Sequence, residues 1–132
     1  MHFAIACPSF DKLHSGFGGN ITITGGTLNM SGGAINVSSI NTGDAGSISL
    51  TADAVSMDSG AQISTSVDGA GNGGLLQVVS TGEVVLDGQA TDGFQTGLYS
   101  LTEGAGAGGH IEVSGSSVKL SNNATINSES NG

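Results

Sequence analysis

The 132-residue chain contains a unit of short apolar pairs that recurs about every 27 residues. Its first copy begins with "GGNITITGG" (18–26), where apolar and polar residues alternate between two glycine pairs. The first apolar pairs of the four copies are Ile21/Ile23, Ile48/Leu50, Leu76/Val78 and Ile111/Val113. They are separated by steps of 27, 28 and 35 residues, so the last step holds an insertion of about seven residues. A fixed period of this length is typical of solenoids and arrays.

Each copy holds three short segments with the alternation expected of β-strands. A second apolar pair follows the first by seven residues in three copies and by eight in the third copy. A third segment reads Ala61-x-Ile63 and Ala124-x-Ile126, whereas the first copy reads Ala34-Ile35-x-Val37 and predicts a shifted or bulged register. The inward side chains are predicted to be Ile, Leu, Val and Met. Corners such as "GG", "AD", "SG" and "NN" suit the positive φ of sharp turns.

Three strands per period predict one triangular coil, and successive coils would pair in parallel about 4.8 Å apart. Because parallel crossovers are normally right-handed, we expect an all-β, right-handed parallel β-helix. Its three-strand coils of about 27 residues would number about four and occupy residues 16–132, with the insertion near residues 91–104. An antiparallel sandwich also uses short strands, but it needs no such period.

Residues 1–15 lie outside the repeat and form a non-repeat N-terminal segment, a possible cap. Its apolar residues would cover the first coil. They are Phe3, Ile5, Phe10 and Leu13. Nothing comparable follows the last copy, so we expect self-association through open coil ends, because unpaired strand edges are templates for pairing.

Charge and cysteine content exclude several classes of function. Eleven acidic residues face two basic ones, Lys12 and Lys119, and the net charge is −9. Because phosphate backbones are bound through Lys and Arg, nucleic acid is a poor partner. Cys7 is the only cysteine, so the chain has neither an intrachain disulfide nor a cysteine-based metal site. We expect no cofactor and no metal.

The repeat units "GGNITITGGTLNMSGGA", "AGSISLTADAVSMDSGAQISTS" and "GGHIEVSGSSVKLSNNATINSES" resemble those of filamentous haemagglutinin-like adhesins, the exoproteins of two-partner secretion. The resemblance covers about residues 16–132. It implies a structural or adhesive segment without catalytic activity, extracellular or at the bacterial cell surface. It also implies contact with a host, neighbour-cell or matrix surface, through protein or glycan, and a transporter partner for the full-length protein. The family's N-terminal secretion domain is not found here, so we expect a fragment of a longer protein.

Two alternatives share the predicted fold. One is a passenger segment of an autotransporter. The other is a fragment of a carbohydrate-active β-helix enzyme, a polysaccharide lyase or glycosidase, which needs convergent carboxylates. The repeat alignment places Asp58 and Asp87 in one column, about 5 Å apart, but supplies no further acid and no nearby base. We therefore expect a solvated edge and no catalytic residue.

The insertion is the most distinctive candidate for binding. Regular register would turn Asp92 into the core at a high desolvation cost, so the chain should leave the coil there. Phe94, Leu98 and Tyr99 would lie on or near the excursion as a ligand-contact loop, or pack back onto the coil together with Leu101. Insertions of this kind often carry binding function.

A calcium site is a weaker hypothesis. "DGAGNGG" (68–74) resembles part of a calcium-binding glycine-rich repeat, and Asp44 and Asp68 precede Gly46 and Gly74 in loops that the sequence suggests are equivalent. Flexibility at a corner explains the same glycines without a metal ion.

Overall fold

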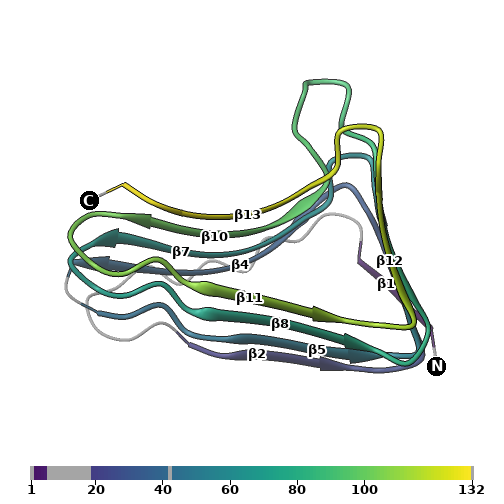
Figure 1. Cartoon of the computed structure of the whole chain (residues 1–132), viewed down its shortest axis with the longest axis horizontal. Helices are drawn as coiled ribbons and strands as arrows, with labels where there is room; N and C mark the ends of the chain where they lie inside the picture. Colours follow the sequence, from purple (N-terminus) through teal and green to yellow (C-terminus); the bar gives the residue numbers. More distant parts are fainter. Residues whose placement is uncertain (1, 6–18, 42, 132) are drawn as a thin grey trace.

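The computed structural model of the chain describes residues 2–5, 19–41 and 43–131 (Figure 1). These residues form strands, turns and loops. The strands are β1 (His2–Ile5), β2 (Ile21–Thr24), β3 (Thr27–Ser31), β4 (Ala34–Asn41), β5 (Ile48–Ala52), β6 (Ala54–Asp58), β7 (Gln62–Gly69), β8 (Leu75–Ser80), β9 (Glu83–Asp87), β10 (Gly97–Glu103), β11 (His110–Ser114), β12 (Ser117–Ser121) and β13 (Thr125–Ser130). Within the described ranges, no helix is present that could cross a membrane.

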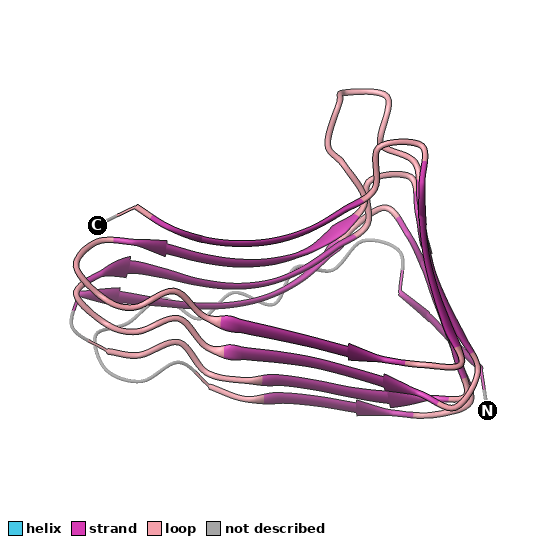
Figure 2. Ribbon diagram, in the orientation of Figure 1, coloured by secondary structure: helices cyan, strands magenta, loops and turns pink. Residues whose placement is uncertain are grey.

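The strands form three parallel sheets that enclose a triangular interior (Figures 1 and 2). Sheet A has the order β1-β3-β6-β9-β12, sheet B the order β13-β10-β7-β4, and sheet C the order β11-β8-β5-β2. The chain visits sheets C, A and B in turn, and each round is one coil. The first coil is β2–β4, the second β5–β7, the third β8–β10 and the fourth β11–β13. This arrangement confirms the predicted parallel β-helix of about four three-strand coils.

The interior is built from columns of like residues that run from coil to coil. Ile48 pairs in register with Ile21 on one side and with Leu76 on the other. Met57 lies likewise between Met30 and Leu86. These central residues are buried, and full burial of such a side chain stabilises the fold by roughly 1.5–3 kcal/mol. The predicted steps of 27 and 28 residues are therefore steps between stacked coils.

The first coil does not contain the shifted strand that its sequence suggested. Ile35 of β4 is in register with Ile63 of β7, and Val37 is in register with Thr65. The difference lies in the preceding corner, which holds only residues 32–33 in the first coil but residues 59–61 in the second. The prediction of a bulged strand was wrong because the corner, not the strand, changes length.

The corners between sheets A and B use left-handed backbone, as their residue types predicted. In the second coil Ser59 and Gly60 have φ values of 56° and 80°, and in the fourth coil Asn122 and Asn123 have values of 51° and 72°. Serine and asparagine in this region are uncommon, although asparagine tolerates it best. The predicted "AD" corner is different, because its Ala52 belongs to β5 and neither residue has a positive φ.

The interior beneath the second half of sheet B mixes hydroxyl groups with valines, contrary to the expectation of a purely apolar lining. Thr65, Ser100 and Thr102 point inward and are buried. The Thr65 hydroxyl donates to Ser100 Oγ at 3.1 Å, and the Thr102 hydroxyl donates to the carbonyl of Ala107 at 3.2 Å. The Thr102 bond reaches the backbone of the glycine-rich loop that leads to sheet C. Hydrogen bonding offsets the cost of burying these polar groups.

The two ends of the coil stack differ in whether a further strand packs on the terminal coil. Strand β1 pairs with β3 and continues sheet A by one strand beyond the first coil. Of the predicted cap, Phe10 and Leu13 lie outside the described residues. At the other end, Val118 and Leu120 of β12 remain 41% and 43% exposed. The fourth coil therefore presents interior positions of its columns to solvent.

Candidate functional site

The insertion is a compact hairpin at the corner between sheets A and B of the third coil (Figure 2). Residues 89–95 stand where the second coil has Gly60 alone. The Gly93 N–H donates to the Ala90 carbonyl at 2.9 Å, the Ala90 N–H donates to the Phe94 carbonyl at 2.7 Å, and Gln89 bridges Gln95. Gly93 has a φ of 93°. This pattern matches a three-residue hairpin loop that ends in a left-handed glycine.

Thr96 closes the corner that the hairpin opens. In the second coil, the Ala61 N–H donates to the carbonyl of Asp58. In the third coil the Thr96 hydroxyl makes the equivalent bond, donating to the carbonyl of Asp87 at 3.0 Å, and it accepts from the Gly60 N–H at 2.9 Å. Because Thr96 is buried, its hydroxyl satisfies two backbone groups that would otherwise lack partners.

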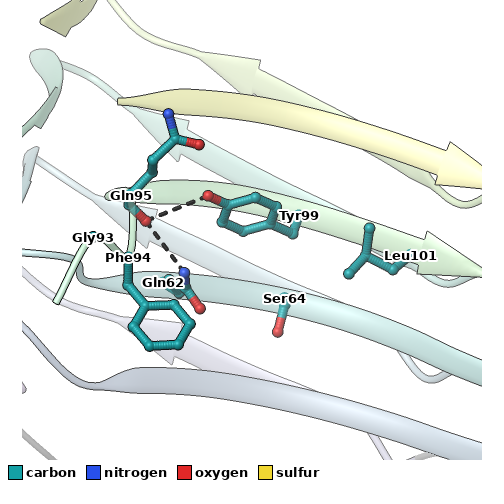
Figure 3. A pocket seen from close by; sticks show the side chains of 7 residues that line it. All are labelled: Gln62, Ser64, Gly93, Phe94, Gln95, Tyr99 and Leu101. Carbon is teal, nitrogen blue, oxygen red and sulfur yellow. Dashed lines mark hydrogen bonds between the residues drawn. The ribbon is translucent and has the colours of Figure 1, made fainter. Parts of the chain in front are cut away.

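The hairpin overhangs sheet B and forms one wall of a groove (Figure 3). The groove has a volume of about 290 Å³. The carbonyl of Gln95 accepts from Gln62 Nε2 at 3.2 Å and from the Tyr99 hydroxyl at 3.3 Å. These bonds tie the hairpin to β7 and β10. Phe94 stays 62% exposed beside them, and partial burial raises the pKa of Tyr99.

A second hollow continues the first along the strands. Its volume is about 260 Å³, and Leu101 lines both hollows. Its far end carries Asp68 of β7 and Glu103 of β10, which are register neighbours. We call the two hollows together the trough. Its floor is the outer face of β7 and β10, with Ser38 and Ser39 of β4 beside the second hollow, and the hairpin stands at its other end.

The three predicted contact residues lie in three different places in the structure. Phe94 lies on the hairpin, as predicted, but Leu98 points inward from β10 and is buried in the core. Its place on a ligand-contact loop was therefore wrong, and the predicted range of 91–104 extended too far, because β10 begins at Gly97 and pairs with β7. Tyr99 lies on the floor of the groove. Asp92 is exposed on the hairpin and not in the core.

The contribution of β7 to the trough was not predicted from the sequence. Gln62, Ser64 and Asp68 occupy the outward positions of that strand. The alternation from residue 62 to 68 would have identified this face. The hairpin that turns it into a groove could not be placed over it without knowing where the chain re-enters the coil.

The carboxylates of the predicted column are held by hydrogen bonds. Asp58 and Asp87 are register neighbours. Asp58 accepts from the Ser31 hydroxyl at 2.7 Å, and Asp87 accepts from the Ser121 hydroxyl at 2.6 Å and from Asn122 Nδ2 at 2.7 Å. The bonds from Ser121 and Asn122 lower the pKa of Asp87 below its usual 3.8. An ionised Asp87 is a poor proton donor, so Asp87 lacks the raised pKa that a general acid requires.

The two aspartates of the calcium hypothesis do not occupy equivalent positions. Asp44 accepts from the Asn72 N–H at 2.6 Å in the loop leading to sheet C. Asp68 belongs to β7 and faces the trough. The predicted equivalence of their two loops was therefore wrong. In the ranges that the structure describes, no group of three or more His, Cys, Asp or Glu side chains could hold a metal ion.

No protein-family model, no curated protein sequence and no solved structure matches the chain. Functional inference therefore depends on the surface of the coil stack.

Proposed function

We propose that the chain is a structural and adhesive β-solenoid segment of a larger bacterial protein that is secreted or exposed at the cell surface. It would act through contact with a host, neighbour-cell or matrix surface and would have no catalytic activity. The resemblance of its repeats to filamentous haemagglutinin-like proteins motivates this proposal, and secretion of the full-length protein would require a transporter partner.

The observation that carries the proposal is the repetition of outward side chains along the coil stack. Ser31, Asp58, Asp87 and Ser121 form one column across the four coils. Their hydrogen bonds run between neighbouring coils and not toward a shared point in solvent. Such a surface favours broad, shallow contacts. A carbohydrate-active enzyme is less well supported, because its acids must converge on one substrate position.

Antibodies against the purified chain test the location. They should label intact cells of the organism that encodes it, and an antibody against a cytosolic protein should label only permeabilised cells. Fab fragments of the same antibodies should reduce attachment of these cells to surfaces that they colonise. Labelling that appears only after permeabilisation would contradict a surface role.

We also propose that copies of the chain associate through the open fourth coil. Val118 and Leu120 offer apolar contact, and β11, β12 and β13 each end their sheet with an unpaired edge. Exposed edges of this kind favour further strand pairing.

A charge placed on this end tests the association. Leu120→Glu should weaken it by about tenfold or more, because a carboxylate would be buried without a partner. Thr51→Glu, at an exposed outward position of β5, adds the same charge away from the end and should leave it unchanged. Sedimentation velocity over a concentration series measures both variants. Equal association of the two would contradict a contact through the fourth coil.

A further inference from the structure

The trough has the length of a short extended segment. Its floor follows β7 from Gln62 to Asp68, six residue steps at about 3.3 Å each, or roughly 20 Å. Phe94 stands at one end, Leu101 lies in the middle, and the acids Asp68 and Glu103 close the other end. The trough therefore changes from aromatic to acidic character along a single axis.

Hydrogen bonds hold the backbone of the hairpin in place, so the exposed Phe94 ring is attached at a fixed position beside the trough. The hairpin is closed by its own backbone bonds and tied to the floor through the Gln95 carbonyl. The exposed Phe94 ring offers a large apolar contact area and a π face at the edge of the groove. The bonds from Gln62 and Tyr99 to the Gln95 carbonyl fix the backbone next to Phe94, which lowers the entropic cost of ordering the hairpin on binding.

The charge of the trough selects the class of ligand. Among the described residues the only ion pair joins Lys119 to Glu83, so no described cation pairs with Asp68 or Glu103. Placing two carboxylates side by side in register is unfavourable without a counter-charge. The chain also carries a net charge of −9, which would attract a basic ligand and repel an anionic one.

The floor restricts how a ligand can bind. Strand β7 pairs with β4 and β10, and β10 pairs with β7 and β13. Their backbone groups are therefore already used, and a ligand cannot join the sheet as an added strand from above. It must be recognised through side chains: an apolar contact at Leu101, a cation or apolar group beside Phe94, and a basic group at Asp68 and Glu103.

We propose that the trough binds an extended basic peptide segment that has Lys or Arg toward its ends and apolar residues between them. One basic side chain would pair with Asp68 and Glu103. An apolar side chain would pack on Leu101, and the segment's other end would lie against Phe94, where a cation is attracted to the face of the ring. This inference deepens the proposed function and rests on it for the view that the chain acts by surface contact.

A synthetic heptapeptide tests the proposal directly. The probe has Lys at both ends and two Leu in the interior that alternate with Thr, so it can bind in either direction. Fluorescence anisotropy with the intact chain should give saturable binding with a dissociation constant between about 10 μM and 1 mM, as expected of a small exposed site. Raising the salt concentration from about 0.02 M to about 0.3 M should weaken binding by about tenfold.

Variants separate specific binding from attraction to an acidic protein. The double variant Asp68→Asn with Glu103→Gln should weaken binding by about tenfold or more, since the paired charges are lost. The double variant Asp53→Asn with Glu112→Gln removes the same charge elsewhere and should change binding by less than about twofold. Phe94→Ala should weaken it by about fivefold, in line with loss of a cation–π contact. Circular dichroism would verify that each variant is folded.

Control probes define the outcomes that overturn the proposal. A peptide with Glu in place of Lys should not bind, and one with Ser in place of Leu should bind more weakly. No saturable binding of the basic probe, or equal weakening by the two double variants, refutes the trough as a basic-peptide site. Binding of a neutral cellohexaose in its place would assign the trough to glycans instead.

The two proposals can fail separately. If Fab fragments block attachment but the probe does not bind, the proposed function survives and the ligand class is wrong. If the probe binds at the trough but the protein is absent from the cell surface, the binding site is correct and the proposed function fails.

Discussion

The third and fourth coils contain the same kinds of interior residue in different surroundings. Val84 and Leu86 of β9 are buried, whereas Val118 and Leu120, their register neighbours in β12, are 41% and 43% exposed. The strands are equal in length and pair with each other. The difference arises because β9 lies between two coils, whereas β12 is the last strand of its sheet. Each layer of a solenoid is covered by the neighbours on both sides of it. In this fold, packing between neighbouring coils therefore supplies much of the stability of each coil.

The largest expected effect is a contrast between two leucines of one column. Leu86→Ala should lower the free energy of unfolding by roughly 2–5 kcal/mol, because it opens a cavity between two coils. Leu120→Ala should lower it by about 1 kcal/mol or less, since that side chain is already partly solvated. Urea denaturation of both variants measures the contrast. Similar losses would show that Leu120 is covered in solution.

The glycine-rich loops offer the next contrast. A methyl group at Gly71 would overlap the carbonyl of Gly43 in the adjoining loop, whereas one at Gly108 would meet nothing closer than Ser130 Cβ at 3.5 Å. Gly71→Ala should therefore cost about 1–3 kcal/mol through overpacking. Gly108→Ala should stay within about 0.5 kcal/mol of the parent. Thermal unfolding of the pair measures this, and a tolerated Gly71→Ala would mean that the loops separate easily.

At the hairpin corner of the third coil, the Thr96 hydroxyl is the hydrogen-bond partner of two backbone groups. Thr96→Val keeps the shape of the side chain but leaves the Gly60 N–H and the Asp87 carbonyl without their partner. We expect a loss of about 1–3 kcal/mol. Thr96→Ser keeps the hydroxyl and should lose less than the valine variant. Chemical denaturation ranks the two, and the reverse order would contradict the assigned hydrogen bonds.

The smallest expected effect concerns an exposed ion pair between the same two coils. Lys119 Nζ lies 2.5 Å from Glu83 Oε1, and its hydrogen bond and charge lower the pKa of Glu83 below the usual 4.5. A carboxylate with a lowered pKa stabilises the fold above its unfolded pKa and loses that contribution as the pH falls through its folded pKa. The stability advantage over Lys119→Met should therefore be small above pH 4.5, decline as the pH falls below 4.5, and vanish below the folded-state pKa of Glu83. An NMR titration of Glu83 whose midpoint is unchanged in Lys119→Met would contradict the pair.

The sequence carries most of the fold because its apolar pairs keep their spacing. Ile21, Ile48 and Leu76 mark a column by their spacing alone, and the strand register confirms it. The buried hydroxyls were missed because Thr65 and Ser100 look like outward residues when position is inferred from polarity. Their inward direction is dictated by alternation from Ile63 and Leu98. The two-residue alternation of a strand is thus a better guide than residue type to whether a side chain points inward or outward.

The candidate site was predictable only in part. The excess residues between Leu86 and Ile111 located the insertion, and Phe94 was placed on it correctly. Where the chain returns to the coil depends on Thr96 and its two backbone partners, a long-range arrangement with no local signal. Without that return point, Leu98 could not be recognised as the next member of the column of Ile35 and Ile63.

The corner of the third coil also has a use in protein engineering. Residues 89–95 interrupt the chain between β9 and β10, yet both strands keep full register with their neighbours. The fold can therefore hold a foreign segment at this point while its scaffold stays intact, which is the property sought in a graft site. The shorter corner at residues 59–61 lies in the adjoining coil. Segments inserted at both corners would be displayed side by side, with a spacing set by the pitch of the coil.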